Sequence, residues 1–421
     1  MLAIDMTSMI PLSVINQTSL TLKYASLKRG VFHDLQRKLL LKYFFIVFIS
    51  LFSFRIYSYP SFIGHGYNSC ITCHYNPYGN GPLNDYGRAL SATAISDRWV
   101  HKSSKSEEEI AKDSGFMYMK AFSSWLRPSV NYRGLKLIRN VDQANEESEY
   151  IHMMANVNAV VRFQDNDKYI ASLSYGYAPT PVAQKNEDVG NYRSREHYFG
   201  YRPTSNLGFY VGMMDKVFGI RVPDHIAFSR SVTGLAQNDQ THGVMVHLVK
   251  NNFEIGIHPF IGNLFQKDDL RQKGVSSKVE YNYSSTIKPG FSVLKSSSDY
   301  VENTLVSVHG KLGFSKGSSA LIEFGQKSQK IVSTKKETSS RYFFLQNHIL
   351  LRRGTYFLVT AEYFRPNIKK ESETMRLGPG LQYFLVQGLE LRFDLYNTKN
   401  FSPYAATNDS WDFTGQIHLW F

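Results

Sequence analysis

The sequence predicts an all-β fold, a transmembrane antiparallel β-barrel of about 16 strands (roughly 14 to 18), preceded by a short irregular and helical segment. Three observations support this prediction. From about Leu126 to Phe421, apolar and polar residues alternate with period two, whereas an amphipathic helix would repeat every 3.6 residues. The alternating runs are about ten residues long, which is the length that a tilted strand needs to cross a bilayer. The connections between the runs are alternately long and short, as in outer-membrane barrels.

The composition excludes several other classes of protein. Of the 421 residues, 43% are hydrophobic, which excludes a disordered chain, and only 20% are charged, which excludes a charge-rich coiled coil. Two cysteines are too few for a disulfide scaffold. Tyr, Phe and Trp together make 14% of the chain, which suits the aromatic girdles of a membrane barrel.

The first residues of the chain predict an export signal. A basic stretch, residues 37–42, precedes the uncharged run 43–54, and Ser58 is the best small residue for cleavage. We therefore expect residues 1–58 to be a leader and signal peptide, with 1–36 as an over-extended start; an uncleaved anchor is the alternative. This segment holds seven Lys or Arg and two Asp, so its removal lowers the net charge from +13 to +8. An excess of that size, without a basic stripe, does not predict nucleic-acid binding.

The two cysteines form the motif Cys70-Ile-Thr-Cys73-His74, which is the attachment pattern of a c-type haem. Two thiols at this spacing reach the two vinyl groups of one haem, and the following histidine supplies the proximal iron ligand. Zinc is one alternative, although a structural zinc site needs four ligands. A redox-active dithiol is another, although it expects a βαβ context.

Residues 59–100 around the motif are rich in Gly, Pro and Asn, with a turn or two of helix near Leu90, and residues 101–124 form a linker. No methionine occurs in this segment, so the sixth iron ligand is open. His65 is the candidate, with a loop histidine that contacts backbone or water as its alternative. The weaker candidates are Met117, Met119 and His101.

Residues 125–421 form the predicted barrel. In one typical run, Leu389, Leu391 and Phe393 alternate with Glu390 and Arg392, so each strand has one apolar and one polar face. The expected strands are 126–138, 150–164, 168–178, 194–203, 206–216, 241–250, 253–262, 275–284, 287–295, 302–314, 318–328, 340–352, 355–365, 374–386, 388–397 and 411–421. The expected long connections are 139–150, 179–193, 217–240, 263–274, 329–339 and 398–410.

The last strand ends on Phe421 and keeps Trp411, Phe413, Ile417 and Leu419 on one face. It resembles the C-terminal assembly signal of bacterial outer-membrane barrel proteins. This ending, the strand length and the alternating connections together favour a barrel over a β-sandwich, which would also alternate.

A barrel of this size is expected to enclose an aqueous lumen. Charged residues on the inward parity suit that lumen, as ordinary solvated charge or as a selective ring for a solute. They are Arg162, Lys278, Glu280, Glu323, Glu362, Glu390, Arg392 and Asp394. The longest connection, residues 217–240, is partly apolar, and it either folds into the lumen or packs over its mouth.

The haem motif, in the sequence GHGYNSCITCHYNPYGNGPLNDYGR, followed by the barrel pattern, resembles the cytochrome c–porin fusions of bacterial outer membranes. The resemblance implies one covalent haem c on Cys70 and Cys73, with His74 as proximal ligand, on the periplasmic side or in the lumen. It implies electron transfer rather than an enzyme. One haem cannot carry electrons alone across the apolar membrane band of about 25 Å. A periplasmic redox partner or cytochrome is therefore expected. A passive porin with this segment as plug or tether is the alternative, and a peroxidase-like enzyme the third.

Overall fold

The computed structural model describes residues 60–79, 81–98, 105–119, 123–141, 143–164, 167–177, 191–224, 226–403 and 408–421. All of them belong to the second of two compact units of the chain, Ile56–Phe421. The predicted leader and signal peptide, residues 1–58, lies outside the described residues, and so does the weak iron-ligand candidate His101. None of the described helices has the length and apolar character to cross a membrane.

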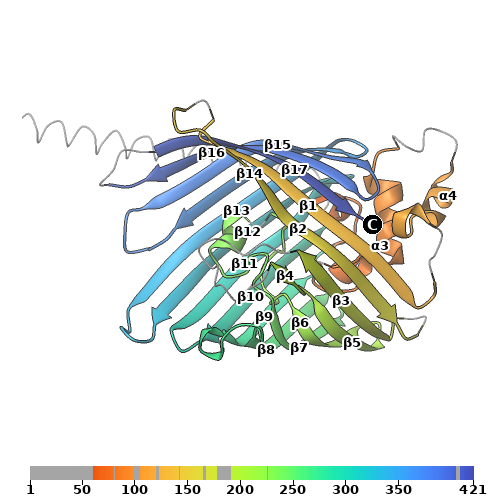
Figure 1. Ribbon diagram of the computed structural model, residues 1–421, viewed down its shortest axis with the longest axis horizontal. Helices are drawn as coiled ribbons and strands as arrows, with labels where there is room; N and C mark the ends of the chain where they lie inside the picture. The colour runs from red at the N-terminus through yellow and green to blue at the C-terminus, as the bar shows by residue number, and fades with distance from the viewer. Residues whose placement is uncertain are drawn as a thin grey trace, which may run out of the picture. The chain divides into compact units, whose positions relative to one another are not determined.

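The described strands form one closed antiparallel sheet of sixteen long strands and the two-residue strand β4 (Figure 1). Each long strand pairs with its neighbours in the chain, and β1 pairs with both β2 and β17, which closes the barrel. The strands are β1 (Leu126–Arg139), β2 (Glu147–Arg162), β3 (Tyr169–Tyr177), β4 (Tyr192–Arg193), β5 (His197–Thr204), β6 (Leu207–Met214), β7 (Thr241–Lys250), β8 (Phe253–Gly262), β9 (Lys273–Tyr281), β10 (Ile287–Ser297), β11 (Val301–Ser315), β12 (Ser318–Ile331), β13 (Glu337–Arg352), β14 (Thr355–Arg365), β15 (Glu373–Val386), β16 (Leu389–Phe401) and β17 (Asn408–Trp420).

The predicted barrel and its sixteen strands are therefore confirmed. Several predicted connections are too long: only residues 140–146, 332–336 and 402–407 separate the strands where 139–150, 329–339 and 398–410 were expected. The strands β12 and β13, for example, continue past the apolar run. Here Gln329 pairs with Thr338 in the ladder. The sequence pattern ends where the apolar face ends, whereas the backbone hydrogen bonds continue beyond it, so alternation alone underestimates these strands.

The two faces of the sheet have opposite chemistry. On β8, Phe253 and Ile257 on the outer face are 44% and 46% exposed, whereas His258 on the inner face is 0% exposed. The same inversion recurs around the barrel, with exposed apolar side chains outside and buried polar side chains inside. An apolar outer belt with every strand paired is the arrangement that a lipid environment requires.

Apart from residues 298–300, 332–336 and 402–407, the connections of six residues or fewer between the long strands lie at one end of the barrel, which we call the short-turn end. They are residues 163–168, 205–206, 251–252, 282–286, 316–317, 353–354 and 387–388. Gly354 and Gly388 occupy the left-handed region there, with φ of 81° and 84°, and the ladder shifts register beside both turns, as at a β-bulge. The opposite end carries the connection from β6 to β7, the longest among the described residues.

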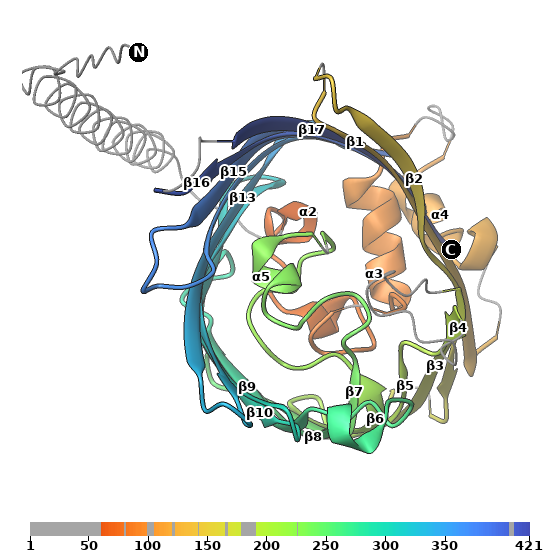
Figure 2. The same cartoon turned by 60° about the vertical axis from the view of Figure 1, so that its left-hand side comes forward.

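Two segments lie inside the ring of strands (Figure 2). The inner segment, residues 60–98, contains α2 (Pro60–Ile63), the 3-10 turn η2 (Cys70–Thr72), α3 (Asp85–Leu90) and the π-helical turn η3 (Ser91–Ile95). The inner loop, residues 215–240, contains α5 (Phe228–Ser231). The remaining described helices are α4 (Glu107–Lys112), η4 (Phe116–Tyr118) and η6 (Asp268–Leu270). The short helix predicted near Leu90 is thus present.

Candidate functional site

The Cys70–His74 motif folds into a single turn. The amides of Cys73 and His74 both donate to the carbonyl oxygen of Cys70, at 3.1 and 2.9 Å. Asn84 fixes this turn from the other side, because its side chain donates to the carbonyl of Thr72 at 3.0 Å and accepts from Gly87 N at 2.8 Å. The start of α3 is therefore tied directly to the motif, and the two thiols and the imidazole arise from one turn.

Helix α3 packs directly against Cys73. A Cβ added at Gly87 would lie 2.9 Å from both Cα and Cβ of Cys73, so only glycine allows this approach. Cys73 is buried, whereas Cys70 is partly accessible. Burial, with the nearby Cys70 thiol, raises the pKa of Cys73 to about 12, so this thiol stays protonated at neutral pH.

His65 lies just after α2 and keeps a buried Nε2 that has no hydrogen-bond partner. Burial, together with the positive charges of Lys316 and Arg353, lowers the pKa of its imidazole and keeps it neutral. The weaker candidates Met117 and Met119 are exposed, at 55% and 43%. The donor set of the inner segment therefore fits a c-type haem: two thiols and a histidine in one turn, and a second, neutral imidazole with a free nitrogen.

The inner segment is fixed to the barrel wall by ion pairs and polar contacts. Ser69 Oγ donates to Glu254 Oε2 at 2.9 Å, and Lys288 Nζ donates to the carbonyl of Asn68 at 3.2 Å. Lys288 and Glu254 also form a buried ion pair with each other. These contacts hold the residues immediately before Cys70 against β8 and β10.

A second anchor lies at the start of α3. Asp85 accepts from the guanidinium of Arg127 at 2.6 and 2.8 Å, and Arg162 lies 3.5 Å from the same carboxylate. The two arginines lower the pKa of Asp85 even though burial acts in the opposite direction. Between the two anchors, the Tyr75 ring packs in an apolar cluster of the lumen with Tyr198 and Tyr210.

The inner segment also meets the short turns of the barrel. Gly317 N donates to the carbonyl of Gly64 at 2.7 Å, and Asp97 N donates to the carbonyl of Phe384 at 2.9 Å. Arg353 donates to the carbonyl of Ser96 at 2.7 Å. The segment thus lies at the short-turn end of the lumen.

The inner loop folds into the lumen, which decides between the two placements expected from its sequence. Its backbone amides donate to side chains of the wall: Val217 N to Ser276 Oγ at 3.1 Å, Gly219 N to Ser292 Oγ at 3.0 Å, Ile220 N to Glu323 Oε2 at 2.8 Å and Phe228 N to Glu362 Oε1 at 2.7 Å. These amides lie outside the sheet and have no carbonyl of a neighbouring strand as a partner. Hydroxyl and carboxylate groups of the wall accept their hydrogen bonds instead.

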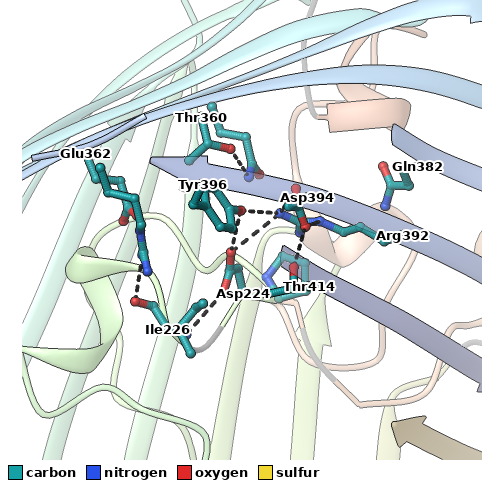
Figure 3. Close-up of polar contacts among 12 residues, drawn as sticks. Asp224, Ile226, Thr360, Glu362, Gln382, Arg392, Asp394, Tyr396 and Thr414 are labelled. Atoms are coloured by element: carbon teal, nitrogen blue, oxygen red, sulfur yellow. Dashed lines mark hydrogen bonds and ion pairs between the residues drawn. The ribbon is translucent and has the colours of Figure 1, made fainter. Parts of the chain in front are cut away.

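Arginines of β15 and β16 hold the middle of the inner loop (Figure 3). Arg392 lies between Asp394, at 2.8 Å, and Asp224 of the loop, at 3.5 Å. Arg376 donates to the carbonyl of Ile226 at 2.9 Å and pairs with Glu362. The positive charge of Arg392 on the wall therefore offsets the negative charge of Asp224 on the inner loop.

The predicted inward orientation of the wall charges is confirmed, but their predicted solvation is wrong. Lys278, Glu280, Glu323, Glu362, Glu390, Arg392 and Asp394 are all buried. The inner segment and the inner loop fill the space that an empty lumen would leave to water. The sequence showed the parity of each strand, but it did not show which segment would cover these groups.

A pocket lies between the inner segment and the inner loop. Tyr78 contributes from the segment, and Lys216, Arg221, Ser229 and Arg230 contribute from the loop. None of these residues was singled out from the sequence. The only signal was the mixture of arginines and apolar residues in the longest connection, which is unusual for a solvated loop.

No protein-family model and no curated protein sequence matches this chain. Solved outer-membrane barrels match its fold. OmpT of Vibrio cholerae aligns with a TM-score of 0.55 at 9% identity, over 70% of this chain and 97% of its own. An anion-selective porin from Comamonas acidovorans gives 0.54 at 10% identity, over 70% and 99%. The outer membrane channel DcaP of Acinetobacter baumannii gives 0.53 at 11% identity, over 70% and 97%. The fold is therefore that of outer-membrane porins.

Proposed function

We propose that this protein is a bacterial outer-membrane channel of the porin type, in which the inner segment acts as a plug. The observation that carries the proposal is a closed barrel with an apolar outer belt and an inner loop folded into the lumen between β6 and β7. The porin and channel titles of the structural neighbours point in the same direction. In such barrels the short turns face the periplasm, so the plug would lie at the periplasmic end.

Two contacts of the plug with the wall involve charged side chains. Ser69 and Asn68 contact the Glu254–Lys288 pair of the wall, and Asp85 pairs with Arg127. Breaking one anchor would release part of the segment and leave the strand pairing intact. Solute flux through the barrel would then depend on the plug and not on the wall.

The test is single-channel conductance of the full chain in planar bilayers. We expect discrete conductance steps, and a higher open probability in Asp85→Asn, which removes the charge that holds α3. The matched control is Glu302→Gln, which breaks an exposed pair with Lys330 and should leave the conductance unchanged. A folded, inserted wild-type protein and a folded Asp85→Asn protein that both fail to conduct would contradict the channel.

We also propose that one haem c is attached to Cys70 and Cys73, with His74 as its proximal ligand. The specific observation in favour is the single turn that brings both thiols and the imidazole together, with the neutral His65 on the same inner segment. Bound haem would supply a one-electron redox centre. Asn84 and Gly87 would hold the turn in place, and His65 would be the sixth ligand. A periplasmic redox partner would exchange electrons at this end.

Absorption spectra of the purified full chain, reduced and oxidised, test the haem proposal together with a stain for covalent haem. We expect a c-type spectrum and covalent haem in the wild type. The variant His74→Ala should keep covalent haem but show an altered spectrum, and Cys70→Ala with Cys73→Ala should lose the stain. His152→Ala, which alters a histidine on β2 at the far end from the turns, serves as the control. A wild-type chain without covalent haem, made in a host that matures c-type cytochromes, would refute the proposal.

A further inference from the structure

We propose that the pocket between the inner segment and the inner loop binds a small oxyanion of the carboxylate or phosphate class. This inference rests on the proposed channel function and refines it, because it names the class of solute that the lumen would recognise. The pocket is bounded by Tyr78 on one side and by Lys216, Arg221, Ser229 and Arg230 on the other.

Three polar groups that line this pocket lack hydrogen-bond partners. They are Tyr78 Oη, Ser229 Oγ and Arg230 Nε, and all three atoms are buried. The Ser229 and Arg230 residues are 3% and 5% exposed. Leaving such a group unpaired is costly, and a guanidinium can only donate. The two hydroxyls can donate or accept, whereas Arg230 Nε can only donate, so a ligand with acceptor atoms is the kind that satisfies all three groups.

The carboxylates that line the same pocket already have partners. Glu323 accepts from Ile220 N at 2.8 Å and from the Tyr342 hydroxyl at 2.7 Å. Asp239 accepts from Ala236 N at 2.7 Å. Asp215 accepts from the Gln240 amide at 2.9 Å and pairs with Arg221. None of these carboxylates bonds to Tyr78 Oη, Ser229 Oγ or Arg230 Nε, which have no hydrogen-bond partner.

Two further arginines near Arg221, Arg195 and Arg133, add positive charge beside the pocket. Arg195 is 6% exposed, and its Nε has no hydrogen-bond partner. Its other nitrogens donate to the carbonyl of Met153 at 3.3 Å and to Met154 Sδ at 2.8 Å. The Gln237 side chain, oriented so that both of its amide atoms are satisfied, accepts from Arg195 at 2.6 Å. All three partners are neutral, and no described carboxylate lies within ion-pair distance of Arg195.

Arg133 lies next to Arg195, because it is paired with Met154 in the ladder between β1 and β2. It also donates to the carbonyl of Pro223 in the inner loop at 3.1 Å. Burial, with Arg133 and Arg193 nearby, lowers the pKa of Arg195 to about 9. Arg133, Arg195 and Arg221 outnumber the nearby carboxylates Glu196 and Asp215, and a bound anion would offset this buried excess of positive charge. A cation would instead meet the lysine and arginines that line the pocket.

Binding is tested first with inorganic phosphate as the probe, by titration calorimetry of the full chain in detergent. We expect saturable binding in the wild type and a loss of about tenfold or more in affinity in Arg230→Gln, since a charge-assisted hydrogen bond is removed. Ser229→Ala should weaken binding less and is the smaller perturbation of the fold. Arg139→Gln removes the same charge from an exposed position and should bind as the wild type does. No saturable binding in the folded wild type, or unchanged binding in both pocket variants, would overturn the site.

Planar-bilayer recordings of the same proteins separate this inference from the channel itself. A folded chain that conducts but does not bind phosphate would refute the proposed anion site but not the proposed channel. Phosphate binding without conductance would support the proposed anion site and refute the proposed channel. If both hold, the reversal potential under a salt gradient should indicate anion preference in the wild type and a reduced preference in Arg230→Gln.

Discussion

The two segments inside the barrel are held by different kinds of contact. The inner segment meets the wall through side chains, at the Glu254–Lys288 pair and at Asp85–Arg127, and through backbone hydrogen bonds to the short turns. The inner loop continues directly from β6 and into β7, and its backbone amides bond to wall side chains along much of its length. The inner segment is therefore the part that can move, while the inner loop belongs to the wall. The following predictions test this difference, from the largest expected effect to the smallest.

Arg392→Met should destabilise the barrel most, because it leaves the buried Asp394 carboxylate without its guanidinium partner and also removes the ion pair with Asp224 of the inner loop. Removing one partner of a buried pair costs about 3–5 kcal/mol. The measurement is the free energy of unfolding of the lipid-reconstituted protein in guanidinium chloride. Lys399→Met, which breaks an exposed pair with Asp409, should change it by about 1 kcal/mol or less. Equal losses in the two variants would show that the loop contacts do not support the wall.

Lys288→Met should loosen the inner segment and not the inner loop. It leaves the Glu254 carboxylate without its ion-pair partner and removes a donor to Asn68. A local cost of about 3 kcal/mol corresponds to roughly hundredfold faster amide exchange. Hydrogen-exchange mass spectrometry should show this over residues 60–79, with residues 215–224 unchanged. Lys330→Met, at an exposed pair, is the control. Equal acceleration in both segments would mean that the two move as one unit.

Gly87→Ala should displace α3 from the cysteine turn, because the added methyl would overlap Cys73. Overpacking of this kind costs about 1–3 kcal/mol. In a Cys70→Ala background without haem, alkylation of Cys73 should become faster. The control is Gly415→Ala, where a Cβ would meet only ordinary contacts at 3.6 Å or more. An unchanged alkylation rate would contradict the close packing of α3 on the turn.

The smallest effect concerns the pH dependence of Cys73 in the haem-free chain. Its folded pKa is raised from 9.0 to about 12, chiefly by burial, so the folded state favours the thiol. The corresponding stability is complete below pH 9.0 and is lost as the pH rises towards 12, about 1 kcal/mol of it by pH 10.

The alkylation rate of Cys70→Ala provides the measurement for this thiol. In the folded protein the rate should keep rising above pH 9, whereas in the urea-unfolded chain it should level off near pH 9 to 10. Parallel profiles in the two states would show that Cys73 is not buried in solution.

The sequence predicted the wall better than the contents of the lumen. Strand parity is a local property, so Glu390, Arg392 and Asp394 could be assigned to the inner face from their neighbours alone. Their burial could not be predicted, because it depends on residues 215–240, which reach them only after the barrel closes. The haem motif was equally local, and its single turn follows from five consecutive residues. Tyr78 and Arg230, in contrast, are far apart in the chain and carried no visible pattern.

By itself, the sequence predicted a closed barrel of about 16 strands and the face of the side chains within its alternating runs. The physical reason is that lipid accepts only apolar side chains and fully paired backbone, which imposes a period of two on every strand. Only the tertiary structure decided that the inner segment and the inner loop share the lumen. It also decided that Tyr78, Ser229 and Arg230 line one pocket. Such contacts join residues that are distant in the chain, so their formation depends on ring closure and not on any local propensity.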